Sequence, residues 1–325
     1  MHRRPYFFEV FTLANFVVLD VVLRRIGLSA FIFLGRSFLT ILPVLLLQAA
    51  VGVAVRAVID RRRGDYLRVV RTTRFVTDVV RMAIMSVLWV HIYGWLKVAV
   101  PALNPRLYDQ FFWNLDRTLF FNLSPNIFFV QLFSHPLAMR VVDWTYANVF
   151  GASLVIGGAF FFSHPDPKTR AGFLNANSTM WIVGAWLYVA FPAFDPCYRF
   201  PEIWLPLSQY LPQTQFLQRL LMTNYQNFTH LAQRPAPVSL LFGLSAFPSL
   251  HTAYVFLVFL WMRGLSRAGR LFFAVFTVII FVGSMVTGWH YLVDALAGLL
   301  LAGLCYAAFR MIPRREREVV SGLVD

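Results

Sequence analysis

The sequence predicts an all-α protein, a polytopic bundle of membrane helices. Of its 325 residues, 58% are hydrophobic and only 14% are charged, whereas roughly a quarter of the residues in soluble domains are charged. The apolar residues are gathered in several runs that are long enough to cross a bilayer. Arginines lie between these runs, which is the pattern that orients membrane helices. We therefore assign the net charge of +14 to membrane orientation and expect no nucleic acid as a partner.

The first part of the chain, residues 1–36, is predicted to be an N-terminal interfacial segment. Residues 6–23 are aromatic and apolar but contain two acidic residues, so we expect a helix in the membrane interface, or at best a poor span. Residues 37–78 are predicted to hold an extra span, at 37–58, and a basic loop. That loop is the strongest cytoplasmic signal in the chain.

Residues 79–312 are predicted to form the main membrane domain, with six spans. An aromatic, proline-containing segment at 101–139 is too polar to cross, so we expect interfacial helices on the outer surface. The longest loop is predicted at 193–246, and a basic cytoplasmic tail at 313–325 completes the chain. The six spans are expected at about 79–100, 140–162, 176–192, 248–264, 271–287 and 291–311.

The basic loops predict one orientation for the whole bundle. Loops 59–78, 163–175 and 263–270 carry arginine or lysine and are predicted to be cytoplasmic, together with the C-terminus. His251 and His290 then open on the same extracytoplasmic side. We expect an integral protein of a bacterial inner membrane, with a candidate site that faces the periplasm.

A histidine–aspartate pair at the start of the last span is the first catalytic signal. His290 and Asp294 are four residues apart, so their side chains lie on one face of a helix and are close enough to hydrogen-bond. Ionisable groups at the edge of an apolar segment are costly near lipid and indicate a functional site. Alone, however, such a pair is a weak signal.

A second helix start supplies the other signal. Pro248 suits a first helical turn, and amides around Ser249 would offer the positive end of the helix dipole to phosphate oxygens. His251 lies in that turn, placed to give a proton to a leaving oxygen. A lone histidine is usually structural, but two such helix starts on one side favour phosphoryl transfer, with His290 as nucleophile and Asp294 fixing its tautomer.

These two stretches resemble the second and third signatures of the type 2 phosphatidic acid phosphatase superfamily. They are residues 247–252, FPSLHT, and residues 290–298, HYLVDALAG. The resemblance implies a six-helix phosphatidic-acid-phosphatase-like core and a phosphohistidine intermediate on His290. It implies a lipid substrate and an alcohol or water acceptor. We expect no metal and no cofactor, because imidazoles and arginines supply the charge.

Departures from the family pattern affect the phosphate clamps. The first signature of the lipid phosphatases is a lysine, six residues and Arg-Pro; here Arg234 and Pro235 match, but Asn227 occupies the lysine position. Their third signature has an arginine six residues before the histidine, where this chain has Ser284. The weakened pattern is more similar to the branch that contains inositol phosphorylceramide synthase.

Other substrate-binding candidates follow from the same resemblance. Residues 191–198 and 115–117 are loosely similar to bacterial members of that branch, and Asp195 and Tyr291 join Ser249 as candidates. Arg199 and Arg234 are candidates for a replacement clamp, since guanidinium holds phosphate oxygens in a bidentate way. The alternative, equally weighted, is that both arginines anchor a loop to anionic headgroups.

We therefore expect an enzyme that moves a phosphoryl or phospho-headgroup unit, of the inositol-phosphate kind, from a lipid to an alcohol. Loss of two clamps favours this version, because a phosphodiester carries a substituent that a tight three-oxygen clamp would exclude. The alternative is a phosphatase for phosphatidic acid or a polyprenyl pyrophosphate. A lipid transporter with a histidine proton relay is less favoured, because the sequence contains no internal repeat.

Overall fold

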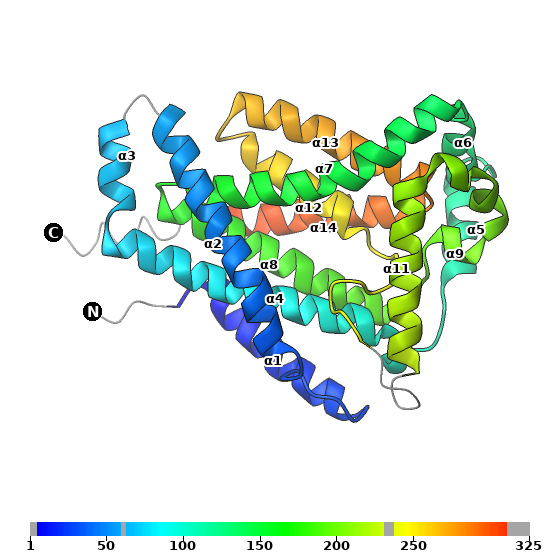
Figure 1. Ribbon diagram of the computed structural model, residues 1–325, viewed down its shortest axis with the longest axis horizontal. Coiled ribbons are helices and arrows are strands. Elements are labelled where there is room, and N and C mark those ends of the chain that lie inside the picture. The colour runs from blue at the N-terminus through cyan, green and yellow to red at the C-terminus, as the bar shows by residue number, and fades with distance from the viewer. Residues whose placement is uncertain (1–4, 60–62, 231–236, 311–325) are drawn as a thin grey trace. The chain divides into compact units, whose positions relative to one another are not determined.

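Every secondary-structure element in the described part of the chain is a helix, as the sequence predicts. The computed structural model describes residues 5–59, 63–230 and 237–310 (Figure 1). The predicted tail at 313–325 and the predicted clamp residue Arg234 lie outside these ranges. In chain order the helices are α1 (Phe7–Arg24), α2 (Leu34–Ile59), α3 (Arg63–Val70), α4 (Thr73–Leu103), α5 (Asp109–Leu119), α6 (Pro125–Leu132), α7 (Pro136–Phe162), α8 (Pro167–Ala190), α9 (Pro196–Arg199), α10 (Pro201–Trp204), the 3₁₀ helix η1 (Leu205–Tyr210), α11 (Pro212–Thr229), α12 (Leu250–Met262), α13 (Arg267–Val286) and α14 (Leu292–Arg310).

Five of these helices, α2, α4, α7, α13 and α14, are long and apolar enough to cross a membrane. They coincide with five of the seven predicted spans. The other two predicted spans correspond to α8, which is long but is not among the five, and to α12, which is apolar but has only 13 residues. Large apolar side chains remain exposed, such as Leu39 at 80% and Leu271 at 69%, as expected where lipid covers a helix. The chain is a multi-pass membrane protein.

The described residues form two compact units. Those of Met1–His91, Leu154–Met180 and Ala302–Asp325 make up the first unit, and those of Ile92–Ser153 and Trp181–Leu301 make up the second. All three predicted catalytic residues belong to the second unit. The domain boundaries expected from the sequence stay predictions.

Two polar side chains of the first unit, Arg81 and His91, find partners within it. The Arg81 guanidinium binds the Glu9 carboxylate through two hydrogen bonds of 2.7 and 3.0 Å. The His91 ring is hydrogen-bonded to the Ser37 hydroxyl and to the Ala30 carbonyl, at 2.8 and 2.7 Å. His91 is therefore a structural histidine, satisfied on both ring nitrogens.

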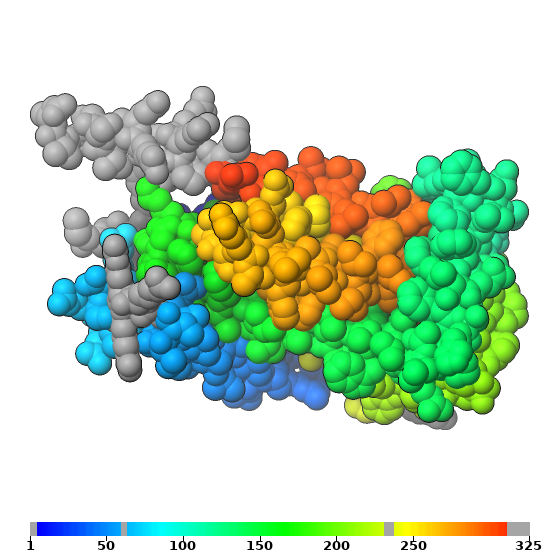
Figure 2. Space-filling view, turned by 90° about the horizontal axis from the view of Figure 1, so that it is seen from above, coloured from blue at the N-terminus to red at the C-terminus, as the bar shows by residue number. Residues whose placement is uncertain are grey.

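The second unit brings several helices together around the predicted site. Helix α12 packs against α13, and α13 packs against α6; Figure 2 shows α13, in orange, meeting the blue-green α6. Helices α12 and α14 lie close together at Gly298, where a Cβ atom would collide with the Ser249 carbonyl oxygen. A small residue at this point lets the two helix starts lie side by side.

The segment at 193–246 is not the long loop that the sequence predicts. It contains α9, α10, η1 and α11. Prolines suggested a loop, but Pro196, Pro201 and Pro212 are each the first residue of a helix, where the missing N–H costs nothing. The helices expected within 101–139 are present as α5 and α6.

Candidate active site

His290 and Asp294 meet at the start of helix α14. His290 lies in the turn two residues before the helix, and Asp294 lies in the first helical turn. Their atoms Nδ1 and Oδ2 are 3.5 Å apart, and both side chains are almost fully buried. This separation exceeds an ordinary hydrogen bond, and neither His290 Nδ1 nor Asp294 Oδ1 has another partner among the described residues. Such contacts in a free enzyme often shorten when charge develops on the ring.

His251 faces His290 across the space between the two helix starts. Their ring centroids are 5.7 Å apart and the ring planes are nearly perpendicular, at 71°. The His251 ring packs against Phe150, with a centroid distance of 4.1 Å, and its Nδ1 lies 3.2 Å from the Tyr146 hydroxyl. The two imidazoles therefore converge on one place, with His251 held from helix α7.

Ser249 joins the two helices instead of lying open to a ligand. It is fully buried, and its amide donates a 2.9 Å hydrogen bond to the Asp294 carbonyl. Its hydroxyl caps α12 by accepting from the Thr252 amide. The amides of Ser249 and Thr252 thus have partners already, so the predicted use of helix-start amides by phosphate does not include these two.

Tyr291 and Asp109 form a buried brace beside the pair. The Tyr291 hydroxyl donates a 2.9 Å hydrogen bond to Asp109 Oδ1, and the Phe194 amide donates to Asp109 Oδ2 at 3.1 Å. Burial raises the pKa of Asp109 and of Tyr291. Tyr291 is completely buried, so its hydroxyl holds the turn in place.

Asp116 caps the helix that carries Asp294. Its two carboxylate oxygens accept hydrogen bonds from the amides of Leu292 and Val293, at 2.6 and 2.8 Å. These amides have no partner within the helix, and a carboxylate there also interacts favourably with the helix dipole. Burial nevertheless raises the pKa of Asp116 to about 7.

The turn that carries His290 is fixed from two further directions. The Asn126 side-chain amide, from α6, donates to the carbonyl oxygens of Met285 and His290, both at 3.1 Å. Gly288 has a φ of +74°, which glycine adopts readily, and the Trp204 indole occupies the place of a Cβ atom.

Charges near the two histidines come from Asp195 and Lys97. Asp195 is buried at the start of α9, and burial raises its pKa to about 7, opposed by the charges of His290 and Lys97. Burial lowers the pKa of His290 to about 4, while Asp195 acts in the opposite direction. His290 is therefore neutral at pH 7, with a lone pair free on one ring nitrogen.

Of the two arginines expected to hold phosphate, the described one, Arg199, makes no contact with either histidine. Arg199 is exposed and lies over the Phe200 ring, 5.4 Å from its centroid, and Arg234 lies outside the described residues. At the two altered clamp positions, the Ser284 hydroxyl donates to the Phe281 carbonyl, and the Asn227 amide donates to the Pro237 carbonyl.

Comparison with known families decides the kind of protein. A model of the PAP2 superfamily matches residues 110–308, more than half of the chain. The chain belongs to the PAP2 superfamily. Membership makes it a membrane phosphatase or phosphotransferase. No curated protein and no solved structure was found to match it.

The region shared with the PAP2 superfamily contains most of the site but not all of it. His251, His290 and Asp294 lie inside the matched range, whereas Asp109 and Lys97 precede it. Within the part of the chain that the structure describes, no group of three or more His, Cys, Asp or Glu side chains could hold a metal ion.

Three residues near the candidate site, Asn126, Lys97 and Asp109, were not among the predicted site residues, and Asp116 was noted only as part of the stretch 115–117. Asn126 and Lys97 carry no motif. Asp109 and Asp116 share the buried face of α5 with Phe112, and this i, i+3, i+7 spacing was the available signal. Acidic residues on the apolar face of a short helix indicate a buried polar contact.

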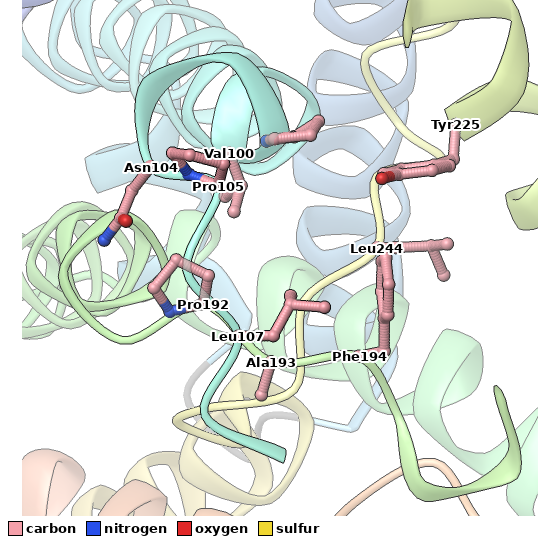
Figure 3. A pocket seen from close by; sticks show the side chains of 10 residues that line it. Val100, Asn104, Pro105, Leu107, Pro192, Ala193, Phe194, Tyr225 and Leu244 are labelled. Carbon is pink, nitrogen blue, oxygen red and sulfur yellow. The ribbon is translucent and has the colours of Figure 1, made fainter. Parts of the chain in front are cut away.

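A small cavity lies beside residues 192–194, which directly precede Asp195 in the chain. Its volume is about 100 Å³, and Pro192, Phe194, Tyr225 and Leu244 are among its lining residues (Figure 3). The lining is mainly apolar, and neither candidate histidine borders it. Its residues come from the end of α4, from α11 and from the segments around Pro192 and Leu244, so the cavity is separate from the imidazole pair.

Proposed function

We propose that this PAP2 protein is a lipid phosphotransferase that moves a phosphoryl or phospho-headgroup unit, of the inositol-phosphate kind, through a phosphohistidine intermediate. The single observation that supports this most is the convergence of two imidazoles, 5.7 Å apart, with a buried carboxylate behind one of them. One ring can attack phosphorus while the other exchanges a proton with an alcohol oxygen.

The first chemical step breaks the bond between phosphorus and the lipid oxygen. Nε2 of His290 attacks phosphorus, and the leaving oxygen takes a proton from His251. For this step His251 must be protonated, and the bound phosphate anion stabilises that positive charge against the effect of burial. Positive charge forms on the His290 ring, where Asp294 Oδ2, 3.5 Å from Nδ1, stabilises it. Because His290 is neutral at pH 7, no deprotonation precedes the attack.

The second step returns the enzyme to its starting state. An acceptor hydroxyl gives its proton to His251, and its oxygen attacks the phosphorus of the phosphohistidine. The bond from phosphorus to His290 Nε2 then breaks. With an alcohol acceptor, a phospho-headgroup unit yields a phosphodiester and a bare phosphoryl unit yields a phosphomonoester. With water, the same two units yield a phosphate ester and free phosphate.

The transferase is favoured over the phosphatase by what stands at the clamp positions. Ser284 and Asn227 replace basic residues, and both are hydrogen-bonded to backbone carbonyls. Fewer bidentate contacts leave room for a phosphate that carries a substituent. The inositol phosphorylceramide synthase-like branch is therefore the preferred relative, and a phosphatase for phosphatidic acid or polyprenyl pyrophosphate is the second candidate.

The location proposed for the protein is a bacterial inner membrane, with the site on the periplasmic face and the C-terminus in the cytoplasm. The support is the placement of arginines in alternate loops. Lipid donors reach such a site from the bilayer, and hydrophilic acceptors reach it from the aqueous side.

The test is product analysis with purified protein in detergent. The protein is incubated with a panel of lipid phosphates and phospholipids, with and without inositol and ceramide-like acceptors, and products are read by mass spectrometry. We expect a new phospholipid that forms only with an acceptor and is lost in His290→Ala, His251→Ala and Asp294→Asn. His135→Ala, which changes an exposed histidine, is the matched control.

Three other outcomes have defined meanings. Free phosphate released without an acceptor, and abolished by the same substitutions, would establish the phosphatase instead. Full activity in His290→Ala would exclude the phosphohistidine mechanism. Proton-coupled lipid movement in that variant, without a covalent phosphoenzyme, would support a transporter.

A further inference from the structure

A phosphate bound between His251 and His290 would lie in a site that contains acidic side chains. Asp294 and Asp195 are both buried there. Burying a phosphate anion near carboxylates is unfavourable unless a cation offsets its charge. Arg199 makes no contact with either histidine and Arg234 lies outside the described residues, but the second unit contains another cation.

Lys97, on α4, is a partly buried lysine without an acidic partner. No carboxylate of the described residues lies within ion-pair distance of its ammonium group. Nζ lies instead 5.7 and 5.6 Å from the ring centroids of Tyr93 and Tyr188, where an ammonium group is attracted to the aromatic faces. These rings hold the cation in place while its charge remains unpaired.

The stem of Lys97 is fixed by packing. A Cβ atom added to Gly243 would lie 2.7 Å from Lys97 Cγ, and one added to Gly94 would lie 2.7 Å from the Leu240 carbonyl oxygen. The segment before α12 therefore presses directly on this part of α4. A long, flexible side chain becomes a preorganised cation.

Three groups of the site respond to the charge of Lys97. Burial is the main cause of the lowered pKa of His290, and the charge of Lys97 lowers it further. Burial also raises the pKa of Asp195, and the charge of Lys97 acts against that increase. Its charge also acts on His251. The packing agrees with this: the Lys97 stem lies against Gly243, three residues before Ala246, whose backbone is hydrogen-bonded to the His290 ring.

The choice of residue at this position is informative. The chain has 29 basic residues, and only Lys97 and Lys168 are lysines. Lysine offers a compact point charge, whereas arginine offers a bidentate fork. A point charge neutralises one phosphate oxygen and leaves the other oxygens free to carry a substituent.

We propose that Lys97 is the phosphate-binding cation of this site, holding a non-bridging oxygen of the substrate while His290 attacks phosphorus. The assignment rests on the proposed function for the identity of the substrate, but the anion site itself does not. Lys97 lies before the range matched by the PAP2 superfamily, so the family match does not assign it.

The first test uses the two lysines of the chain as probe and internal control. The purified wild-type protein is labelled with a small amine-reactive reagent, with and without orthovanadate, and each lysine is followed by peptide mass spectrometry. We expect vanadate to slow labelling of Lys97 at least fivefold and to leave the exposed Lys168 unchanged. Equal rates for Lys97 with and without vanadate would overturn the proposal.

The second test is kinetic. We expect Lys97→Met to lower kcat/KM by about 10²-fold, the loss typical of one preorganised charge at a reacting oxyanion, and to raise the vanadate inhibition constant at least tenfold. Lys97→Arg should recover part of both losses, and Lys168→Met should match the wild type. A fully active Lys97→Met would overturn the proposal.

The two tests separate this proposal from the proposed function. If the wild type forms no phosphotransfer product but vanadate protects Lys97, the phosphotransferase is wrong and the anion site stands. If product forms and Lys97 is neither protected nor required, the phosphotransferase stands and the role of Lys97 is wrong. Protection is measured on unmodified protein, so a poorly folded variant cannot obscure the result.

Discussion

The side-chain amide of Asn126 donates a 3.1 Å hydrogen bond to the carbonyl oxygen of His290. Asn126 is completely buried in α6, and it donates a second bond to the Met285 carbonyl at the end of α13. One amide group therefore ties the turn that carries His290 to the preceding helix. The position of the proposed nucleophile depends on a residue that takes no part in the reaction.

Replacing this amide should disturb the His290 turn. Asn126→Asp removes both donors. The Met285 carbonyl keeps its bond from the Gly288 amide, but the His290 carbonyl loses the Asn126 donor, which costs about 1–3 kcal/mol. We expect a lower melting temperature in detergent and a fall in kcat, with a smaller change in KM. Asn114→Asp changes an exposed asparagine on α5 and should leave both quantities unchanged. A variant with wild-type kcat and stability would show that the turn is held by other contacts.

The pH dependence of stability should report the buried carboxylate of Asp116. Its pKa is raised from 3.8 to about 7 in the folded protein, so the folded state binds the proton more tightly than the unfolded state does. The resulting stabilisation is complete below pH 4 and is lost as the pH rises through 7. Between pH 5 and 8 the wild type should lose on the order of 2 kcal/mol relative to Asp116→Asn.

Thermal unfolding of both proteins across this range checks the prediction. The pKa of His290 is lowered to about 4, so this residue decreases the free energy of unfolding as the pH falls from 6.5. The decrease is the same in the wild type and in Asp116→Asn, so it cancels in the comparison. Asp65→Asn changes an exposed carboxylate and should preserve the wild-type slope. A constant difference between wild type and Asp116→Asn would contradict the prediction.

The close approach of α12 and α14 should make Gly298 sensitive to a single methyl group. A Cβ atom there would collide with the Ser249 carbonyl, and overpacking of this kind costs about 1–3 kcal/mol. We expect Gly298→Ala to be less stable and less active, because the spacing of the two imidazoles changes. Gly303→Ala, on the same helix, meets no atom within 4 Å and should stabilise by up to about 1 kcal/mol.

Single-cysteine labelling tests the predicted orientation in the membrane. The native cysteines, Cys197 and Cys305, are buried, so their background labelling should be low. In intact cells a membrane-impermeant maleimide should label Arg117→Cys, on α5, but should label Lys168→Cys only after permeabilisation. Both positions are exposed. The reverse pattern would place the candidate site on the cytoplasmic side.

The sequence predicted the helices well wherever a long apolar run defined them. It failed at α11, which begins at Pro212 and has mixed polar and apolar residues, because neither length nor apolarity distinguishes such a helix from a loop. It also gave no indication of the contact between Lys97 and Tyr188, since nothing local to Lys97 points to that residue. Helix propensity and hydrophobic periodicity describe single helices, whereas a contact such as the one between Lys97 and Tyr188 joins two different helices.

The same limit explains which parts of the site were found. His251, His290 and Asp294 each lie in a short motif at a helix start, so local spacing was sufficient. Asp116 contacts residues 176 and 177 positions away, and Asn126 contacts one 164 positions away. Such pairings are set by how helices pack, which one sequence read without a fold does not specify.

The bond from the Ser249 amide to the Asp294 carbonyl, and the missing methyl group at Gly298, have a consequence for engineering. Main-chain atoms therefore help to set the separation of the two imidazole rings, together with side chains such as Asn126. A substitution that exchanges one side chain for another leaves the bond between the two main-chain groups in place. The spacing of the two helix starts is for this reason harder to change by point mutation than the side chains that surround them.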